Sequence, residues 1–364
     1  MNPIVQQSTS EIPHWQDVWQ RYRGNLPRHC MGVSRHLQAS LMHALNPQHR
    51  QLRLSYEPYI SLVGSEGARL TDLAGWLSIS KQACNQTVNQ LQRAGDLLRA
   101  PDPGGGRAKQ VMLTQRGREL VAQGSRLAAK VEREYAGLIG QQAFSELVEH
   151  LSKLHDGLGL PGRRPARQRP SNVGSLLPRV TGHMLQRLME LTRSRGHPGL
   201  KMSFAQVLTL IGPDGGRIQQ MARIQEVSKQ AISAVANELE RQAYIRREPD
   251  PAGHRQVLLK LTGRGQQLLS DSVGSIEQLE GELELVTGAA ALRGFKLHIR
   301  QLYEALHLEE EVFGGAAAAP AAAADVQHLA RRLQRQLGRA GAVQLARLLL
   351  DQRTGGPMSA VPVD

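Results

Sequence analysis

Residues 79 to 117 read ISKQACNQTVNQLQRAGDLLRAPDPGGGRAKQVMLTQRG, and residues 227 to 265 read VSKQAISAVANELERQAYIRREPDPAGHRQVLLKLTGRG. The two stretches align without a gap at an offset of 148 positions, and 17 of the 39 positions are identical. Self-similarity at a fixed offset is the sequence signature of a repeated structural unit. The sequence therefore predicts that one fold occurs twice in this chain.

The same offset continues upstream of these stretches, where Leu37 and Gln38 align with Leu185 and Gln186. Residues 157 to 178 between the copies are rich in Pro, Gly and Arg, which is typical of a linker. Residues 314 to 324 read GGAAAAPAAAA, a low-complexity segment broken by proline. We therefore expect a first domain over 1–158, a basic Pro/Gly linker over 159–177, a second domain over 178–311, an Ala/Gly/Pro linker over 312–324 and a C-terminal amphipathic helix over 325–353.

Each copy has the pattern of helices followed by a β-hairpin. In the first copy, apolar spacing predicts helices over about 28–46, 53–64, 70–77, 80–94 and 115–155. Two apolar runs flank the Gly-rich turn at 104–106, as in two strands joined by a loop, and Thr114 is expected to cap the next helix. The predicted fold class is mainly α with small β-hairpin wings, in two tandem winged helix-turn-helix domains with helical segments of the dimerisation type.

The helix expected to begin at Ser80 divides into an apolar and a polar side. Apolar spacing places one set on a buried stripe: Ile79, Ala83, Cys84, Thr87, Val88 and Leu91. The outward set consists of amides and cations without an acid: Lys81, Gln82, Asn85, Gln86, Asn89 and Arg93. Amide side chains can pair with adenine edges, whereas Lys and Arg reach guanine or phosphate. This side is our candidate for reading DNA.

The second copy repeats the arrangement with a plainer outward side. Its expected buried set is Val227, Ala231, Ile232, Val235, Ala236 and Leu239. Its expected outward set is Lys229, Gln230, Ser233, Asn237 and Arg241. Ala234 stands where the first copy has Gln86, and Glu238 adds an acid. Any surface helix has polar residues on one side, but their recurrence in register favours a common function.

The loop of each predicted hairpin carries cations. The first loop has Arg107 and Lys109, and the second has His254 and Arg255. An arginine at a loop tip can enter a narrow minor groove, where the potential is most negative. The alternative of a nucleotide-phosphate cradle at GGGR is disfavoured, because no Gly-Lys-Ser/Thr follows it.

With these elements in this order, the strings LTDLA, ISKQA, NQLQRAG, RAPDP and LTQRG resemble the multiple-antibiotic-resistance regulator (MarR) family. The resemblance covers about residues 30–155 and 178–308. It implies a bacterial regulator that binds pseudopalindromic operator DNA, with the second helix of the pair in the major groove and the wing in the minor groove. It also implies terminal helices that form a dimer interface, and release from DNA by small, often phenolic, ligands or by oxidation.

Two features depart from the family pattern. Family wings usually carry an Asp two residues before the final Arg, but this chain has Gly105 and Gly253 there, which leaves Arg107 and Arg255 less preorganised. Members usually have one module per chain, so this chain could act as a monomeric pseudo-dimer or as a homodimer.

Composition and charge limit the other functions. The chain has 45 Lys and Arg against 32 Asp and Glu, and its formal charge of +13 favours polyanionic partners. No signal peptide or run of about 18 apolar residues is present, so we expect a cytoplasmic, nucleoid-associated protein without membrane contact. No catalytic signature or metal-ligand spacing stands out, and neither enzymatic activity, a cofactor nor a metal is expected.

The two cysteines leave one regulatory alternative open. Cys84 lies on the predicted apolar stripe and is expected to be a small buried hydrophobe. Cys30 lies near the start of the first long helix, where some peroxide-sensing relatives keep a reactive cysteine, so redox sensing is a second hypothesis for it. The C-terminal helix could dock on the chain's own helices, mediate dimerisation or touch DNA.

The sequence thus predicts a sequence-specific regulator of transcription, a repressor, that binds double-stranded DNA at an asymmetric operator and is relieved by a small aromatic effector. Two alternatives remain. The winged helices could serve as a protein-interaction or architectural module without sequence readout, or only the first domain could read bases.

Overall fold

The computed structural model describes residues 15–45, 53–64, 66–77, 79–101, 109–160, 173–225, 227–250 and 257–309. All of them belong to one compact unit, Met1–Gly314. The expected linker over 312–324 and the C-terminal helix over 325–353 lie outside the described residues, as do residues 161–172 of the first expected linker.

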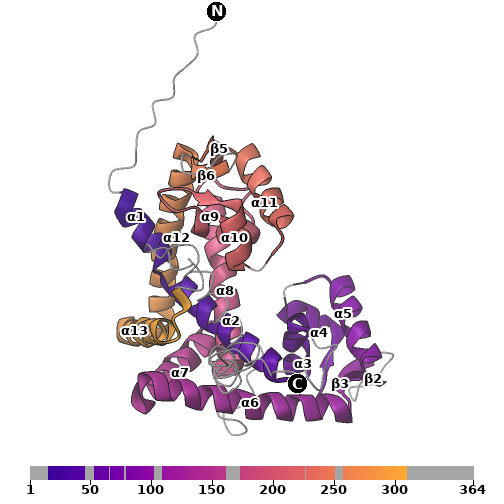
Figure 1. Cartoon of the computed structure of the whole chain (residues 1–364). Helices are drawn as coiled ribbons and strands as arrows, with labels where there is room; N and C mark the ends of the chain where they lie inside the picture. Colours follow the sequence, from indigo (N-terminus) through magenta and orange to yellow (C-terminus); the bar gives the residue numbers. More distant parts are fainter. Residues whose placement is uncertain are drawn as a thin grey trace, which may run out of the picture. The chain divides into compact units, whose positions relative to one another are not determined.

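Helices dominate the first half of the described chain (Figure 1). Its elements in order are α1 (Trp15–Arg23), α2 (Leu26–Leu45), a 3-10 turn (Leu54–Tyr56), α3 (Glu57–Val63), β1 (Ala68–Arg69), α4 (Leu70–Trp76), α5 (Lys81–Arg93), β2 (Leu97–Pro101), β3 (Lys109–Leu113), α6 (Gln115–Ile139) and α7 (Gln141–Gly157). We call α3 to β3 the first module.

The second half repeats the succession from α2 onward. Its elements are α8 (Val173–Ser194), α9 (Met202–Ile211), β4 (Gly216–Arg217), α10 (Ile218–Gln225), α11 (Lys229–Arg241), β5 (Ile245–Pro249), β6 (Val257–Leu261), α12 (Gly263–Thr287) and α13 (Ala289–Ala305). We call α9 to β6 the second module. None of the helices in the described ranges is long and apolar enough to cross a membrane.

Each module contains a small antiparallel sheet of three strands, with the third strand in the middle. The orders are β1-β3-β2 and β4-β6-β5. Leu97 pairs with Leu113 in the first hairpin, and Ile245 pairs with Leu261 in the second. Three helices with such a hairpin are consistent with a winged-helix fold, whereas the short strands β1 and β4 were not predicted.

The expected cap at Thr114 is confirmed. The Thr114 hydroxyl accepts a hydrogen bond from Gly117 N at 3.0 Å and donates one to Gly95 O at 2.6 Å. A Cβ at Gly117 would lie 2.1 Å from Asp96 O, and one at Gly265 would lie 2.0 Å from Tyr244 O. The glycine that ends each repeated stretch is therefore required, because the start of α6 or α12 touches the backbone that enters the wing.

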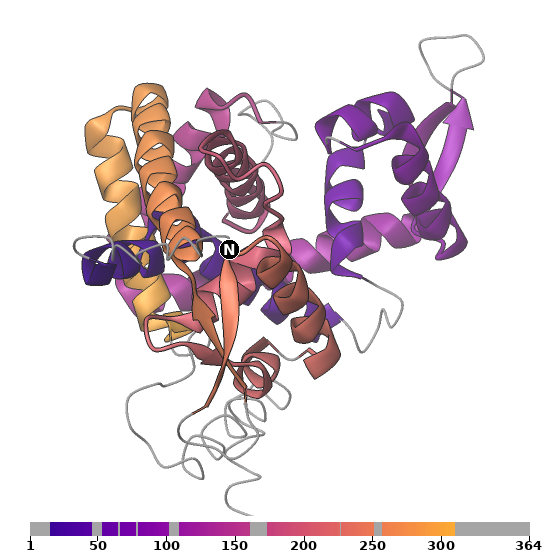
Figure 2. The same cartoon turned by 90° about the horizontal axis from the view of Figure 1, so that it is seen from above.

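Helices from both halves share one hydrophobic core. It is built from α2, α6 and α7 of the first half and α8, α12 and α13 of the second, and includes Leu37, Leu147, Leu177, Phe295 and Leu302, all with no exposed surface. Figure 2 shows α12 and α13 lying side by side, and contacts also join α13 to α7 and α2 to α8. The two halves are thus held together by apolar burial as well as by the chain.

Each module has a smaller core of its own. Val88, Leu91 and Val111 lie in the first, and Phe204 and Leu239 lie in the second. The second also takes in Trp19 and Tyr22 from α1. Helix α1 was not predicted, and its buried partners lie in the second half of the chain.

Some helix boundaries differ from the predictions. The helix expected over 115–155 is two helices, α6 and α7, separated by Gly140 at φ 92°, a value that favours glycine. Helix α8 begins at Val173, ahead of the expected domain start at 178.

The predicted apolar stripes were wrong at their first positions. Ile79 and Val227 are 36% and 43% exposed, and Ala83 and Ala231 are exposed too. Ile79 precedes the capping serine in a non-helical backbone, so helical spacing does not apply to it. The buried stripe of α5 consists of Cys84, Val88 and Leu91, with Thr87 half-buried.

Truncation of Leu147 should show how strongly the shared core holds the fold. Leu147→Ala leaves a cavity among helices of both halves, and we expect the free energy of unfolding to fall by about 2–5 kcal/mol. Leu138→Ala, at a side chain that is 48% exposed, is the matched control and should change it by less than about 0.5 kcal/mol. Equal losses in urea denaturation would contradict this role of the core.

Candidate nucleic-acid interface

Both second helices of the helix-turn-helix pairs begin at a serine cap. Ser80 Oγ accepts a hydrogen bond from Ala83 N at 3.1 Å, and Ser228 Oγ accepts one from Ala231 N at the same distance. Such caps satisfy amide groups that the first helical turn leaves without partners. The predicted start of α5 at Ser80 is confirmed, and the two helices begin in the same register.

The outward set of α5 divides into exposed and half-buried residues. Lys81, Gln82, Gln86 and Arg93 are exposed, whereas Asn85 and Asn89 are half-buried. The difference arises from β2, because the side chain of Arg99 reaches across to the helix. Arg99 Nη2 donates to Asn85 Oδ1 at 2.6 Å and to Asn89 Oδ1 at 3.0 Å.

The two asparagines therefore play a part that the sequence did not predict. Their amide oxygens accept hydrogen bonds from a guanidinium within the module, so they fasten α5 to the wing strand. The lysine and glutamines on the adjacent exposed side, Lys81, Gln82 and Gln86, remain open to solvent.

The outward set of α11 is arranged differently. Lys229, Gln230, Asn237 and Arg241 are exposed, and Ser233 is half-buried. Asn237 Oδ1 accepts a hydrogen bond from Arg247 Nη2 at 2.7 Å.

Acids engage the cations around α11. Arg247 also forms an ion pair with Glu240. Arg241 Nη2 lies 3.7 Å from Glu238 Oε1, and Lys201 forms an ion pair with the same carboxylate.

Arg99 and Arg247 are functional candidates that the sequence reasoning missed. They occupy the same position in the two copies, two residues before the PDP sequence that both share at 101–103 and 249–251. Identity at aligned strand positions was the available signal. Helical spacing does not single out a strand residue, and neither arginine lies at the loop tip.

The wing loops themselves lie largely outside the described residues. This applies to Arg107, His254 and Arg255, while Lys109 is exposed at the start of β3. At the base of the second wing, Arg217 Nε donates to Asp250 Oδ2 at 2.5 Å and Arg217 Nη2 donates to Asp250 Oδ1 at 3.2 Å. This pair ties the end of β5 to β4.

Neither cysteine is placed for redox chemistry. Cys84 is buried against the Leu70 carbonyl, as expected for a small core residue. Cys30 is fully buried in the shared core, and burial raises the pKa of its thiol far above the ordinary value. The thiolate is the reactive form, so the structure disfavours peroxide sensing at Cys30. Within the described residues, no group of His, Cys, Asp and Glu could hold a metal ion.

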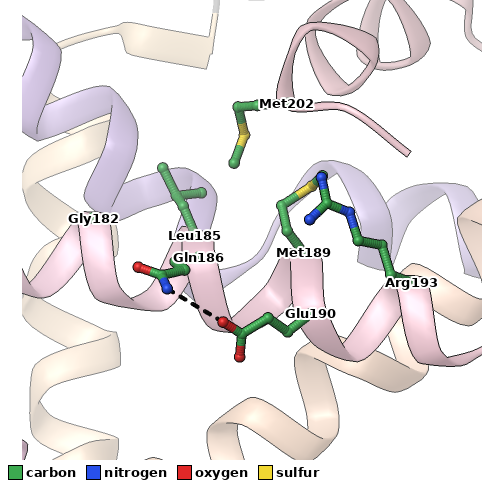
Figure 3. Close-up of a pocket in the computed structure, with 7 residues that line it drawn as sticks. All are labelled: Gly182, Leu185, Gln186, Met189, Glu190, Arg193 and Met202. Carbon is green, nitrogen blue, oxygen red and sulfur yellow. Dashed lines mark hydrogen bonds between the residues drawn. The ribbon is translucent and has the colours of Figure 1, made fainter. Parts of the chain in front are cut away.

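An open hollow of about 490 Å³ lies on α8 beside the start of α9 (Figure 3). Its lining comprises Gly182, Leu185, Gln186, Met189, Glu190, Arg193 and Met202. The methionines and the leucine make it apolar on one side. Arg193 is engaged through two donors with Leu200 O at 3.0 and 2.9 Å.

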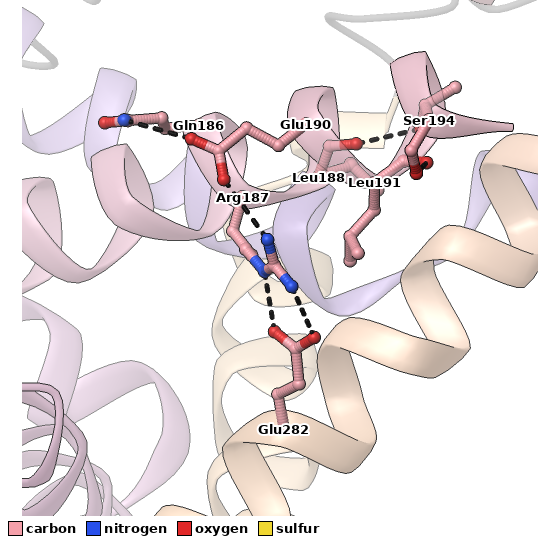
Figure 4. A network of polar contacts seen from close by, with 8 residues as sticks. Gln186, Arg187, Leu188, Glu190, Leu191, Ser194 and Glu282 are labelled. Atoms are coloured by element: carbon pink, nitrogen blue, oxygen red, sulfur yellow. Dashed lines mark hydrogen bonds and ion pairs between the residues drawn. The ribbon is translucent and has the colours of Figure 1, made fainter. Parts of the chain in front are cut away.

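A polar network joins this hollow to α12 (Figure 4). Glu190 accepts hydrogen bonds from Gln186 at 3.3 Å and from Arg187 at 3.2 Å. Arg187 also binds Glu282 of α12 through two hydrogen bonds of 2.8 and 2.9 Å, which lower the pKa of that carboxyl group. A group bound in the hollow would thus touch residues linked to the helix that follows the second wing.

Comparison with known proteins bears on the second module. Residues 199–256, which include α9 to β5, match the sequence model of the MarR family. The chain is similar to the crystal structure of a MarR-family transcriptional regulator from Rhodococcus sp. RHA1, with 24% identity over 31% of this chain and 78% of that chain, at a TM-score of 0.26.

It is also similar to a probable transcriptional regulator from Pseudomonas aeruginosa, with 18% identity over 31% of this chain and 86% of that chain, at a TM-score of 0.25. No curated protein matches the chain.

Removal of the Arg99 guanidinium should loosen α5 without unfolding the module. In Arg99→Met, the lost hydrogen bonds to Asn85 and Asn89 should lower the free energy of unfolding by about 1 kcal/mol and speed amide exchange in α5. Arg93→Met, at the exposed end of the same helix, is the matched control. If exchange in α5 is equally fast in both variants, Arg99 does not position the helix.

Proposed function

We propose that the protein is a sequence-specific, double-stranded DNA-binding regulator of transcription that carries two winged helix-turn-helix modules in one chain, the product of a tandem duplication. The observation that carries this proposal is the pair α5 and α11. Each begins at a serine cap, buries its middle against its own module and exposes a lysine and a glutamine at its first two positions.

The exposed side of α5 suits the major groove. Gln82 and Gln86 have amide groups that can pair with adenine edges, and Lys81 has a cation for guanine or phosphate. A helix of this size fits the groove with its first turns toward the bases. Family members regulate transcription, and the match over 199–256 supports the same activity for this chain.

The shared core supports a pseudo-dimer within one chain. The helices that meet in it come from both halves, as the helices of two protomers would in a homodimer. One chain could then place both modules on one operator, about one helical turn apart. We infer a repressor in which the two half-sites differ, because the two outward sides differ.

Exchange of one residue between the copies tests base reading. Gln86→Ala should relax base preference in one half-site, with a loss of about 1–3 kcal/mol on the preferred sequence. Ala234→Gln places the same amide at the aligned position of α11 and should sharpen preference in the other half-site. The measurement is selection of bound sequences from random DNA.

The wild-type selection separates the candidate functions. A two-part motif supports the proposal, and a half motif indicates that only the first module reads bases. If no motif emerges from a protein that still binds duplexes, the chain is an architectural module. Gln142→Ala, on α7, is the surface control and should leave the selected motif unchanged.

We further propose that a small aromatic effector relieves DNA binding from the hollow on α8. Gly182 is exposed there, and a Cβ on it would meet no atom within 4 Å. Gly182→Phe should therefore fill the hollow and leave basal operator affinity unchanged. Benzoate or phenol should release operator DNA from the wild type and not from this variant. Equal release from both proteins would place the effector elsewhere.

A further inference from the structure

We infer that Glu238 and Glu240 of α11 hold the cations of the second module in internal ion pairs, and thereby make it the weaker of two unequal DNA-binding halves. This inference rests on the proposed function. The carboxylates of Glu238 and Glu240 would then weaken the binding of DNA by the second module.

Glu238 engages cations from two sides. Lys201, at the start of α9, forms an ion pair with its carboxylate, and Arg241 approaches it at 3.7 Å one turn further along α11. The side chains of Lys201 and Arg241 are 55% and 73% exposed, so both are open to a ligand. One carboxylate thus lies between two exposed cations that could otherwise meet phosphate.

Glu240 engages the strand cation. Its carboxylate forms an ion pair with Arg247 of β5, and the same guanidinium donates to Asn237. In the first module, the aligned residue Arg99 donates to two neutral amide oxygens, those of Asn85 and Asn89, and to no carboxylate of the described residues. The contacts of the two arginines therefore differ in charge. Arg99 with its two asparagines is cationic, whereas Arg247 with Glu240 and Asn237 is neutral overall.

The aligned positions in the first module have no acids. Gln90 corresponds to Glu238 and Gln92 corresponds to Glu240 at the offset of 148. Gln90 accepts a hydrogen bond from Tyr56 at 3.1 Å. Helix α5 contains no Asp or Glu, so no carboxylate of its own helix competes with a DNA phosphate for its cations.

The second hairpin also pairs its outward cations with an acid. Glu248 of β5 lies 2.6 Å from Arg246 and 3.1 Å from Lys260, and their hydrogen bonds lower its pKa. The aligned residues of the first wing are Leu98, Ala100 and Met112. Glu248 thus holds two cations of the second hairpin, at positions where the first hairpin has apolar residues and no cation.

These acids are better explained by an effect on DNA than by stability. Ion pairs between exposed side chains usually contribute little to folding. A cation that neutralises a DNA phosphate releases counterions, which makes affinity depend on salt. A carboxylate beside that cation competes with the phosphate and repels it. The second module should therefore add less affinity and a smaller salt dependence than the first.

Reciprocal exchange of these residues tests the inference in the full chain. Glu238→Gln/Glu240→Gln gives α11 the residues of α5, and Gln90→Glu/Gln92→Glu does the reverse. The double control Glu284→Gln/Glu304→Gln makes the same charge change on α12 and α13. Affinity for a selected operator and for a random duplex is measured by fluorescence anisotropy at several salt concentrations, after thermal unfolding confirms that each variant is folded.

The first variant should bind DNA at least about fivefold more tightly than the double control, with a salt slope steeper by about one to two. The second variant should bind more weakly, with a shallower slope. If the first variant and the control behave alike, the acids do not attenuate binding and the inference fails. If the wild type itself binds neither duplex, the proposed function fails, and this result is distinct because it appears before any substitution.

Discussion

The fold of the described chain depends on the burial of helices from its first half against helices from its second half. Leu37 and Leu147 of the first half and Phe295 and Leu302 of the second lie in one apolar cluster with no exposed surface. A separated half would present this apolar side to water, which is unfavourable in proportion to the area exposed. Helices α2 and α6 flank the first module in the chain, and α8 and α12 flank the second. Each module is therefore attached to helices of this core.

The repeat made much of the local structure predictable. Short-range patterns predicted the serine and threonine caps, the hairpins and the buried middle of α5. Each of these patterns occurs in both copies at the same aligned positions. Long-range contacts were not predictable in this way. Trp19 and Tyr22 join the core of the second module from the start of the chain, and their aromatic pattern alone does not indicate that partner. The break at Gly140 was missed because the apolar spacing continues on both sides of it.

At the candidate interface, the sequence indicated which residues are polar and outward, but it did not indicate which of them form hydrogen bonds with other side chains. Asn85 and Asn89 looked like base readers, and the structure shows them bound to Arg99. Helical periodicity describes one helix at a time, whereas this contact joins a helix to a strand. The wing arginines illustrate a different limit, since Arg107 and Arg255 lie outside the described residues and their role remains a prediction from sequence.

Two copies in one chain can differ where two protomers of a homodimer cannot. A substitution in a homodimer changes both recognition surfaces, but here a change from Gln to Glu at one aligned position affects one module only. The differences at 90 and 238, 92 and 240, and 86 and 234 fall on the second helix of the pair, while the capping serines and the glycines that end the repeated stretches are identical. The capping residues and the exposed lysine and glutamine at the start of each helix have been kept, whereas several outward residues further along the helix have diverged. Under the proposed function, an unequal pair of modules would suit an unequal pair of half-sites. Because a covalent link fixes which module accompanies which, the chain would then bind an asymmetric site in a single orientation.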